Sequence, residues 1–314
     1  MRHLALITII GLLSAEFAFA QQRDCGRQTI PVSLYHRDGT PIPKLDSADF
    51  EGLYGGKSIL VNSVTLAQRP HAVLALLDAS GSVLEDPREW SFFVNMTKEL
   101  FGIVPADVEV GFASFSGKIE AAVPPTTDRK RLRDELESVR ESALKGAKRR
   151  TAIWDAITGG IELFGHPAVG DAIYLITDGN DNLSKADPEK VNRSLITAGV
   201  RLFLLLRTPN DSRDIVRPFG PAELQNLAKQ TGGLSSLFQW PINEDLINKS
   251  GALSQLGMLV HVQHEQILNF NLLNVSVPGP IEKPRPWHLD FHSPDHHEGA
   301  DTVLAYPQLL PPCR

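Results

Sequence analysis

The stretch Ala72-Val-Leu-Ala-Leu-Leu-Asp78-Ala-Ser80-Gly-Ser82 decides the fold of this 314-residue chain. Its first six residues are apolar and uncharged, which is typical of a buried strand. Asp78 ends this run, and Ser80 and Ser82 follow with small residues between them, which allow a tight turn. Carboxylate and hydroxyl oxygens are ligands that a hard divalent cation prefers. The motif therefore predicts a cation site at a strand end, and the alternative is a plain strand-to-helix turn with a capping serine.

Two later segments supply oxygen ligands of the same kind. A second apolar run, 172–177, ends at Asp178, and Thr151 opens an amphipathic pattern over 151–164. In an open α/β sheet, ligands gather outside the carboxyl ends of the strands, near the point where the strand order reverses. We therefore expect Asp78 and Asp178 to lie at such strand ends, with Thr151 at a loop-to-helix junction.

Together these residues resemble the metal-ion-dependent adhesion site of the von Willebrand factor type A family, whose pattern is Asp-x-Ser-x-Ser, then Thr, then Asp. The five matching positions are Asp78, Ser80, Ser82, Thr151 and Asp178. The resemblance covers about residues 70–240 and implies Mg²⁺ (or Mn²⁺) as the bound cation. It further implies direct contacts from the hydroxyls, aspartates that act directly or through waters, and an open coordination position that accepts a carboxylate from a protein partner.

The middle of the chain alternates between strand and helix patterns, which indicates βαβ units. Expected helices cover 89–100, 128–144, 151–164, 187–198 and 221–230, and expected strands cover 72–77, 108–115, 118–123, 172–177, 200–206 and 234–238. We therefore predict an α/β fold with a doubly wound, mainly parallel sheet (type A or Rossmann-like) over 69–240.

The sequence on each side of this domain has a β pattern. Residues 21–68 alternate like strands, and Asp38-Gly39-Thr40-Pro41 is a turn signal. With Leu45 to Phe50, this segment resembles the short β module of secreted bacterial proteins called VWFA-related, which are plentiful in acidobacteria. We expect an N-terminal β module over 21–68.

The C-terminal part, 241–314, also has alternating stretches, at His261 to Leu273 and Trp287 to His292. We predict a β-rich extension there, similar to the one that follows the type A domain in the same bacterial family. Its Pro-rich end, 307–312, is expected to be extended and either docked or flexible.

The N-terminus predicts export. Arg2 and His3 precede an apolar stretch from Leu4 to Leu13, and Ala18-Phe19-Ala20 offers small residues for cleavage. The apolar stretch is short for a membrane span, and we expect no later span. The expected signal peptide covers 1–20, and the expected location is secreted or periplasmic.

Two cysteines, Cys25 and Cys313, lie near the ends of the mature chain. In an oxidising compartment they can form one bridge, and chain ends often lie close together. Two free surface thiols are the alternative.

Several other functions lack support in the sequence. The net charge of −6 argues against nucleic acid as a partner. A histidine-rich segment, comprising His288, His292, Asp295, His296 and His297, has no recognised zinc spacing and is more typical of a surface loop. The nucleophile-elbow, phosphate-loop and dinucleotide-binding motifs do not occur, so we expect no enzyme activity.

We therefore predict a secreted, metal-dependent protein-binding (adhesion) module whose partner supplies an acidic residue to the metal. The loops Val83 to Glu89, 145–150 and 180–185 are expected to select the partner. The alternatives are a metal-assisted hydrolase, for which Asp181 is the nearest candidate base, and a structural component of a surface assembly.

Overall fold

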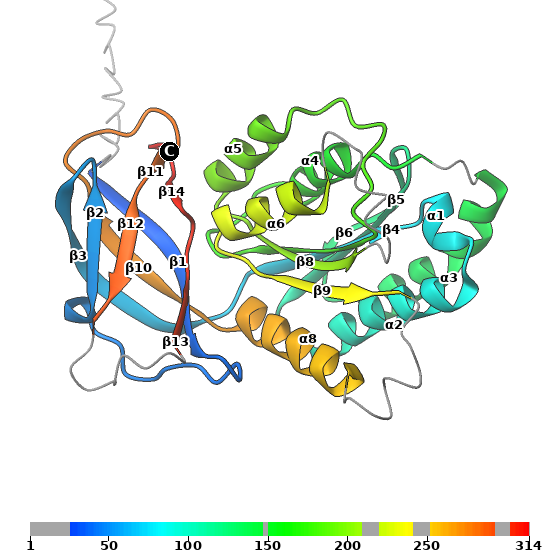
Figure 1. Ribbon diagram of the computed structural model, residues 1–314, viewed down its shortest axis with the longest axis horizontal. Helices are drawn as coiled ribbons and strands as arrows, with labels where there is room; N and C mark the ends of the chain where they lie inside the picture. Colours follow the sequence, from blue (N-terminus) through cyan, green and yellow to red (C-terminus); the bar gives the residue numbers. More distant parts are fainter. Residues whose placement is uncertain (1–25, 147–149, 209–219, 241–251, 293–301, 314) are drawn as a thin grey trace, which may run out of the picture.

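The computed structural model describes residues 26–146, 150–208, 220–240, 252–292 and 302–313. Their main elements are two six-stranded sheets, one of which is covered by helices and one of which is antiparallel (Figure 1). The expected signal peptide over 1–20 lies outside the described residues.

The helix-covered sheet is mainly parallel, as predicted, and has the strand order β6-β5-β4-β7-β8-β9. Its strands are β4 (Ala72–Asp78), β5 (Glu109–Phe115), β6 (Ile119–Thr126), β7 (Ala172–Thr177), β8 (Arg201–Thr208) and β9 (Ser235–Gln239). β6 runs antiparallel to β5, and the other neighbouring pairs are parallel. Because β4 is buried on both faces, it has the continuous apolar run that the sequence shows.

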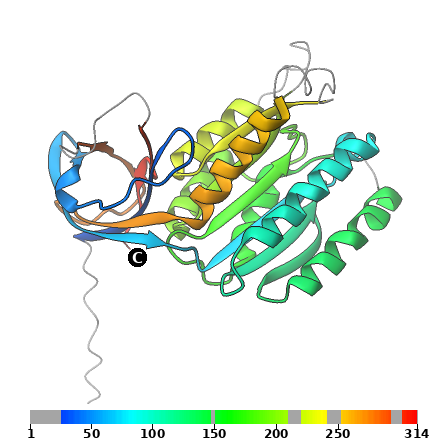
Figure 2. The same cartoon turned by 90° about the horizontal axis from the view of Figure 1, so that it is seen from below.

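Helices cover both faces of this sheet. They are α1 (Gly81–Leu84), α2 (Pro87–Ile103), α3 (Arg129–Gly146), α4 (Ile153–Leu163), α5 (Pro188–Ala198), α6 (Pro221–Gln230) and α8 (Ala252–Leu268). Residues of α2, α3 and α8 share one apolar core with Val73 and Leu77 of β4. Residues of α4, α5 and α6 share a second core with Leu74 and Leu76. Figure 2 shows α8, α2 and α3 side by side on one face, so the fold is doubly wound.

The second sheet is antiparallel and combines both ends of the described chain, in the order β12-β2-β3-β10-β1-β13. Its elements are β1 (Arg27–His36), the 3-10 turn η1 (Ser47–Asp49), β2 (Phe50–Tyr54), β3 (Lys57–Gln68), β10 (Phe270–Ser276), β12 (His288–Phe291) and β13 (Thr302–Ala305). A two-stranded sheet of β11 (Arg285–Pro286) and β14 (Leu309–Leu310) lies beside it. The N- and C-terminal β segments, which the sequence assigned to separate additions, thus form one β module with one apolar core.

The α/β domain is inserted between two strands of this β module. β3 precedes the domain and β10 follows it, and the two strands pair with each other, with Gln68 opposite Phe270. The chain therefore leaves the β module and returns to it at adjacent positions, as Figure 1 shows.

One predicted β segment is wrong. His261 to Leu273 was expected to be a strand, but 261–268 belong to α8 and the strand β10 begins at Phe270. Val260, Gln263 and Ile267 are buried at helical spacing against β8 and β9, whereas a short apolar run is also compatible with a strand. The α/β domain therefore extends to Leu268, beyond the expected end at 240.

The Pro-rich end is docked. Pro307 forms a β-bridge with Thr231, and Gln308 N donates to Gln230 O at 2.9 Å. Trp287 Nε1 donates to Pro307 O at 2.6 Å. This segment therefore ties the β module to the end of α6. Among the described residues, no helix is long and apolar enough to cross a membrane.

Candidate cation site

The two predicted aspartates lie at the switch point of the α/β sheet. From β4 the chain moves outward to β5 and β6, and it then returns to β7 on the other side of β4. Asp78 is the last residue of β4, and Asp178 directly follows β7. Crevices at such switch points are where open α/β sheets bind ligands, so the expected placement of this pair is confirmed.

A chain of hydrogen bonds joins the Asp-x-Ser-x-Ser loop to Asp178. Ser80 N donates to Asp78 Oδ1 at 2.9 Å, and the Ser80 and Ser82 hydroxyl oxygens are 3.1 Å apart. Ser82 Oγ in turn donates to Asp178 Oδ2 at 2.6 Å. On the other side, Thr177 Oγ1 donates to Asp78 Oδ2 at 2.6 Å. Four of the five predicted ligands thus form one cluster of oxygens.

Thr151 is held against the loop that follows Asp178. Asn182 N and Leu183 N donate to Thr151 O at 3.0 and 3.1 Å, and Thr151 N donates to Asn182 Oδ1 at 2.9 Å. The residue is buried.

The site has an excess of buried negative charge. Burial, reinforced by the nearby Asp178 carboxylate, raises the pKa of Asp78 to about 7. Glu89 of α2 is also buried, and this burial raises its pKa to about 7 although Arg207 opposes the shift. Arg207 donates from Nη1 to Glu89 Oε2 at 2.8 Å and from Nη2 to Asp178 Oδ2 at 3.0 Å.

Glu89, Thr177 and Arg207 were missed at the sequence level. Arg207 lies near the end of the apolar run of β8, at the same sheet edge as Asp78 and Asp178, and this position was an available signal. Glu89 lies four residues before Phe93 on the buried face of α2. Only the fold reveals that this face turns towards Arg207.

Asp181, the candidate base of a hydrolase, has a structural role. Its Oδ2 accepts from Ile153 N at 2.7 Å and from the Ser184 hydroxyl. Ala152 precedes α4 and provides no side-chain cap. Asp181 therefore satisfies the first amides of that helix, which otherwise lack partners.

The surface predicted to select a partner is narrower than expected. Val83 and Glu89, the ends of the first predicted loop, are both buried. Glu85, Pro87 and Arg88 between them are exposed. In the second loop, residues 147–149 lie outside the described residues.

The histidine-rich segment is only partly described. His288 Nε2 lies 2.9 Å from Asp290 Oδ1, and His288 Nδ1 lies 3.3 Å from the Tyr306 hydroxyl. Asp295, His296 and His297 lie outside the described residues. Within the described ranges, no group of three or more His, Cys, Asp or Glu side chains is arranged to hold a metal ion.

Cys313 is disulfide-bonded. Cys25, the other cysteine of the sequence, lies outside the described residues, so the Cys25–Cys313 pairing stays a prediction.

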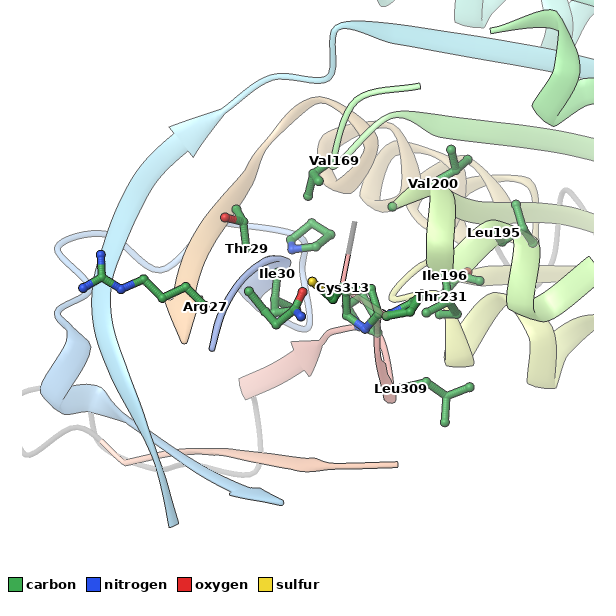
Figure 3. Close-up of a pocket in the computed structure, with 16 residues that line it drawn as sticks. Arg27, Thr29, Ile30, Val169, Leu195, Ile196, Val200, Thr231, Leu309 and Cys313 are labelled. Atoms are coloured by element: carbon green, nitrogen blue, oxygen red, sulfur yellow. The ribbon is translucent and has the colours of Figure 1, made fainter. Parts of the chain in front are cut away.

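A separate cavity of about 300 Å³ lies between the β module and the α/β domain (Figure 3). Ile30, Leu195 and Val200 contribute apolar side chains to its wall, and Arg27 points away from it. Thr231, a polar residue of the wall, already donates to Ala228 O and accepts from Leu202 N. The cavity lies at the amino edge of the parallel sheet, opposite the candidate cation site.

The donor set of that site fits a hard divalent cation. Ser80, Ser82 and Thr151 offer hydroxyl oxygens, and Asp78 and Asp178 offer carboxylates, which suit Mg²⁺ and Mn²⁺ better than softer metals. Burial is the largest cause of the raised pKa of Asp78, and repulsion from the nearby Asp178 carboxylate adds to it. A bound cation would relieve that repulsion.

The comparison with protein families identifies the α/β domain. The family model of the von Willebrand factor type A domain matches residues 73–180, a stretch that begins in β4 and ends just after Asp178. Residues 73–180 are thus a match to the von Willebrand factor type A domain, as the adhesion-site motif predicted. Domains of this family are protein-interaction modules.

Solved structures with a similar arrangement come from several organisms. BatB from Bacteroides thetaiotaomicron is 24% identical over 59% of this chain and 98% of its own, with a TM-score of 0.44. A von Willebrand factor type A protein from Catenulispora acidiphila is 11% identical over 91% and 73%, with a TM-score of 0.45. The human COPII-coat protein Sec24c is 13% identical over 89% and 49%, with a TM-score of 0.46. The comparison with curated proteins gave no match.

Proposed function

We propose that this protein is a secreted, metal-dependent protein-binding module. In this proposal Asp78, Ser80, Ser82, Thr151 and Asp178 hold one Mg²⁺ or Mn²⁺ ion. The observation that carries the proposal is the chain of hydrogen bonds from Asp78 through Ser80 and Ser82 to Asp178. It brings hard oxygen donors from two strand ends to one place, beside a domain of an interaction family.

A protein carboxylate is the proposed external ligand. A cation that is held partly by hydroxyls keeps surplus positive charge, and an Asp or Glu from a partner would neutralise it. Arg150, which is exposed at the end of the second predicted selecting loop, adds positive charge that favours an acidic surface. Export from the cytoplasm is proposed on the N-terminal pattern of residues 1–20.

Calorimetry tests the cation site. The wild-type protein and the variants Asp78→Ala, Thr151→Ala and Asp107→Ala are each titrated with Mg²⁺ and Mn²⁺. Asp107→Ala is the control, because the Asp107 carboxylate is exposed near the opposite end of the strands. We expect one bound ion in wild type and control, and none in the two site variants, with folded spectra throughout. Unchanged metal affinity in Asp78→Ala would reject the site.

Capture of candidate surface proteins tests the function. We expect capture in Mg²⁺, loss of capture in EDTA, and loss when one carboxylate of the partner is replaced. Moderate salt should weaken capture far less than EDTA does, because direct ligation is screened less than exposed charge pairs. Equal capture in EDTA would show that this face is not the binding surface, and unfolding of Asp78→Ala would favour a structural role.

A further inference from the structure

Arg207 is placed between two buried carboxylates at the edge of the cation site. Its guanidinium joins Asp178 Oδ2 at 3.0 Å to Glu89 Oε2 at 2.8 Å. The side chains of Asp178 and Glu89 are 0% and 1% exposed, and that of Arg207 is 21% exposed. The same Asp178 oxygen also accepts from Ser82 Oγ, so Arg207 and the serine of the adhesion motif share one carboxylate oxygen.

Glu89 contacts Arg207 and makes no direct bond to the adhesion motif. Its Oε2 accepts from Arg207, whereas its Oε1 is buried and has no hydrogen-bond partner among the described residues. Burying a carboxylate with one oxygen unsatisfied is unfavourable. Packing alone gives no reason for a carboxylate at this position, since an uncharged side chain would avoid that penalty.

The charges around the site match one divalent ion. When ionised, Asp78, Asp178 and Glu89 carry three negative charges, and Arg207 carries one positive charge. Two negative charges are left in excess. Without Arg207 the excess would be three, and without Glu89 it would be one.

We propose that the Arg207–Glu89 pair sets the cation affinity and charge selectivity of the site, with Arg207 weakening cation binding and Glu89 offsetting that effect. This inference rests on the proposed metal-binding function. Arg207 repels a cation that approaches Asp178 and occupies a lone pair of its carboxylate. Glu89 partly cancels the repulsion and holds the guanidinium at Asp178.

The proposal predicts opposite signs for two substitutions. Arg207→Met removes the repulsion, so the affinity for Mn²⁺ is expected to rise by about tenfold and that for Tb³⁺ by about thirtyfold, because Coulomb energy scales with ion charge. Glu89→Gln leaves the arginine uncompensated, and the affinity for Mn²⁺ is expected to fall by about tenfold. The double variant is expected to lie within about threefold of wild type, since the two effects cancel.

The experiment is calorimetry with Mn²⁺ and luminescence with Tb³⁺ at pH 8, above the raised pKa values of Asp78 and Glu89. Arg193→Met and Glu189→Gln are matched controls, because these residues form an exposed pair with N–O distance 3.4 Å on α5. They are expected to leave both affinities unchanged. Arg207→Lys keeps the charge and is expected to bind like wild type, and circular dichroism verifies the fold of every variant.

The outcomes separate this inference from the metal site itself. Failure of wild type to bind any cation rejects the proposed function and the inference together. If wild type binds but Arg207→Met binds Mn²⁺ more weakly, Arg207 merely orients Asp178 and the inference is wrong. Unchanged cation affinities in both Arg207→Met and Glu89→Gln also overturn the inference. If Arg207→Met does not fold, the cation affinity of Glu89→Gln alone tests the inference.

Discussion

Charged groups are buried at both ends of the parallel strands, at their carboxyl ends (the carboxyl edge) and at their amino ends (the amino edge). The two groups differ in how their hydrogen bonds are satisfied. At the carboxyl edge, the Arg207 guanidinium joins Asp178 and Glu89, and hydroxyl groups donate to Asp78 and Asp178. Glu89 keeps an oxygen that has no partner among the described residues. At the amino edge, Arg201 and Asp171 are equally buried, but backbone groups satisfy them.

The amino edge is a closed set of hydrogen bonds. Arg201 donates from Nε and Nη2 to Gly170 O, from Nη1 to Gln266 O and from Nη2 to Ile267 O, at 2.7–3.1 Å. Its guanidinium carbon also lies 4.2 Å from the centre of the Phe270 ring. Asp171 accepts from Ala72 N and Ala168 N, both at 2.8 Å.

The difference separates a structural cluster from the proposed cation-binding cluster. Groups whose hydrogen bonds all end on the backbone hold elements together, and here they hold the C-terminal end of α8 and the start of β4. Carboxylates that face each other with spare lone pairs instead favour a cation. Substitutions at the two edges should therefore change stability in opposite directions.

The largest effect is expected at Arg201. Arg201→Met leaves three buried carbonyl groups without their donor, so the free energy of unfolding should fall by about 3–5 kcal/mol. Urea denaturation monitored by fluorescence measures it. Arg193→Met on the exposed face of α5 is the control and should change stability by less than about 0.5 kcal/mol. Equal stability of the two variants would contradict the structural role.

Gly170 lies in the same cluster and is expected to tolerate no side chain. Its φ is +97°, and an added Cβ would lie 2.2 Å from the Phe270 ring. Gly170→Ala should cost about 2–4 kcal/mol through strain and overpacking. Gly165 has φ +66° with nothing within 4 Å of an added Cβ, so Gly165→Ala isolates the backbone term of about 1 kcal/mol. Similar losses in the two variants would show that contact with Phe270 is unimportant.

The carboxyl edge should make the metal-free protein less stable as pH rises. The pKa values of Asp78 and Glu89 are raised to about 7 from ordinary values of 3.8 and 4.5. Between the ordinary and the raised pKa values, these two carboxyl groups hold protons in the folded state that they have lost in the unfolded state. The free energy of unfolding therefore falls as pH rises through this range. From pH 5 to pH 8 in EDTA we expect a loss of a few kcal/mol, and saturating Mg²⁺ should offset it at pH 8. Urea titrations across this range measure the slope, and a flat or rising curve in EDTA would contradict it.

The smallest effect has the opposite sign to that at Arg201. Asp78→Asn removes one of the crowded charges. Its amide oxygen can still accept from Ser80 N, and its amide NH2 can donate to Thr177 Oγ1 in place of the bond that Thr177 donates to Asp78. At pH 8 in EDTA it should therefore raise the free energy of unfolding by about 1–2 kcal/mol, while it abolishes Mg²⁺ binding. Thermal melts with and without Mg²⁺ provide the measurement. A destabilised Asp78→Asn protein in EDTA would show that the carboxylate holds the fold together.

Local signals made the α/β domain predictable. The run 72–77 indicated a strand because both faces of β4 are covered, and α6 was predicted with its observed bounds because Pro221 starts it and Gly232 and Gly233 follow it. At the site, the positions of Asp78 and Asp178 followed from strand ends alone.

The missed features depend on contacts between distant segments. The pairing of Arg27 with Ser276 joins strands that no local pattern relates, so one β module was read as two additions. α8 was missed because its short apolar pattern fits both helical and strand periods. Arg207 and Glu89 come from different elements, and only the packing of α2 beside β8 brings them together.

The insertion of the α/β domain between β3 and β10 has a consequence for the order of folding. During synthesis, β1, β2 and β3 emerge first, but β10 and β12 follow only after the whole inserted domain. Closing so long a loop as an unfolded chain carries an entropic cost. Once the inserted domain folds, its two ends lie side by side at Gln68 and Phe270, and most of that cost has already been met. The folded type A domain thus closes the loop between β3 and β10 and brings the two halves of the β module close enough to pair.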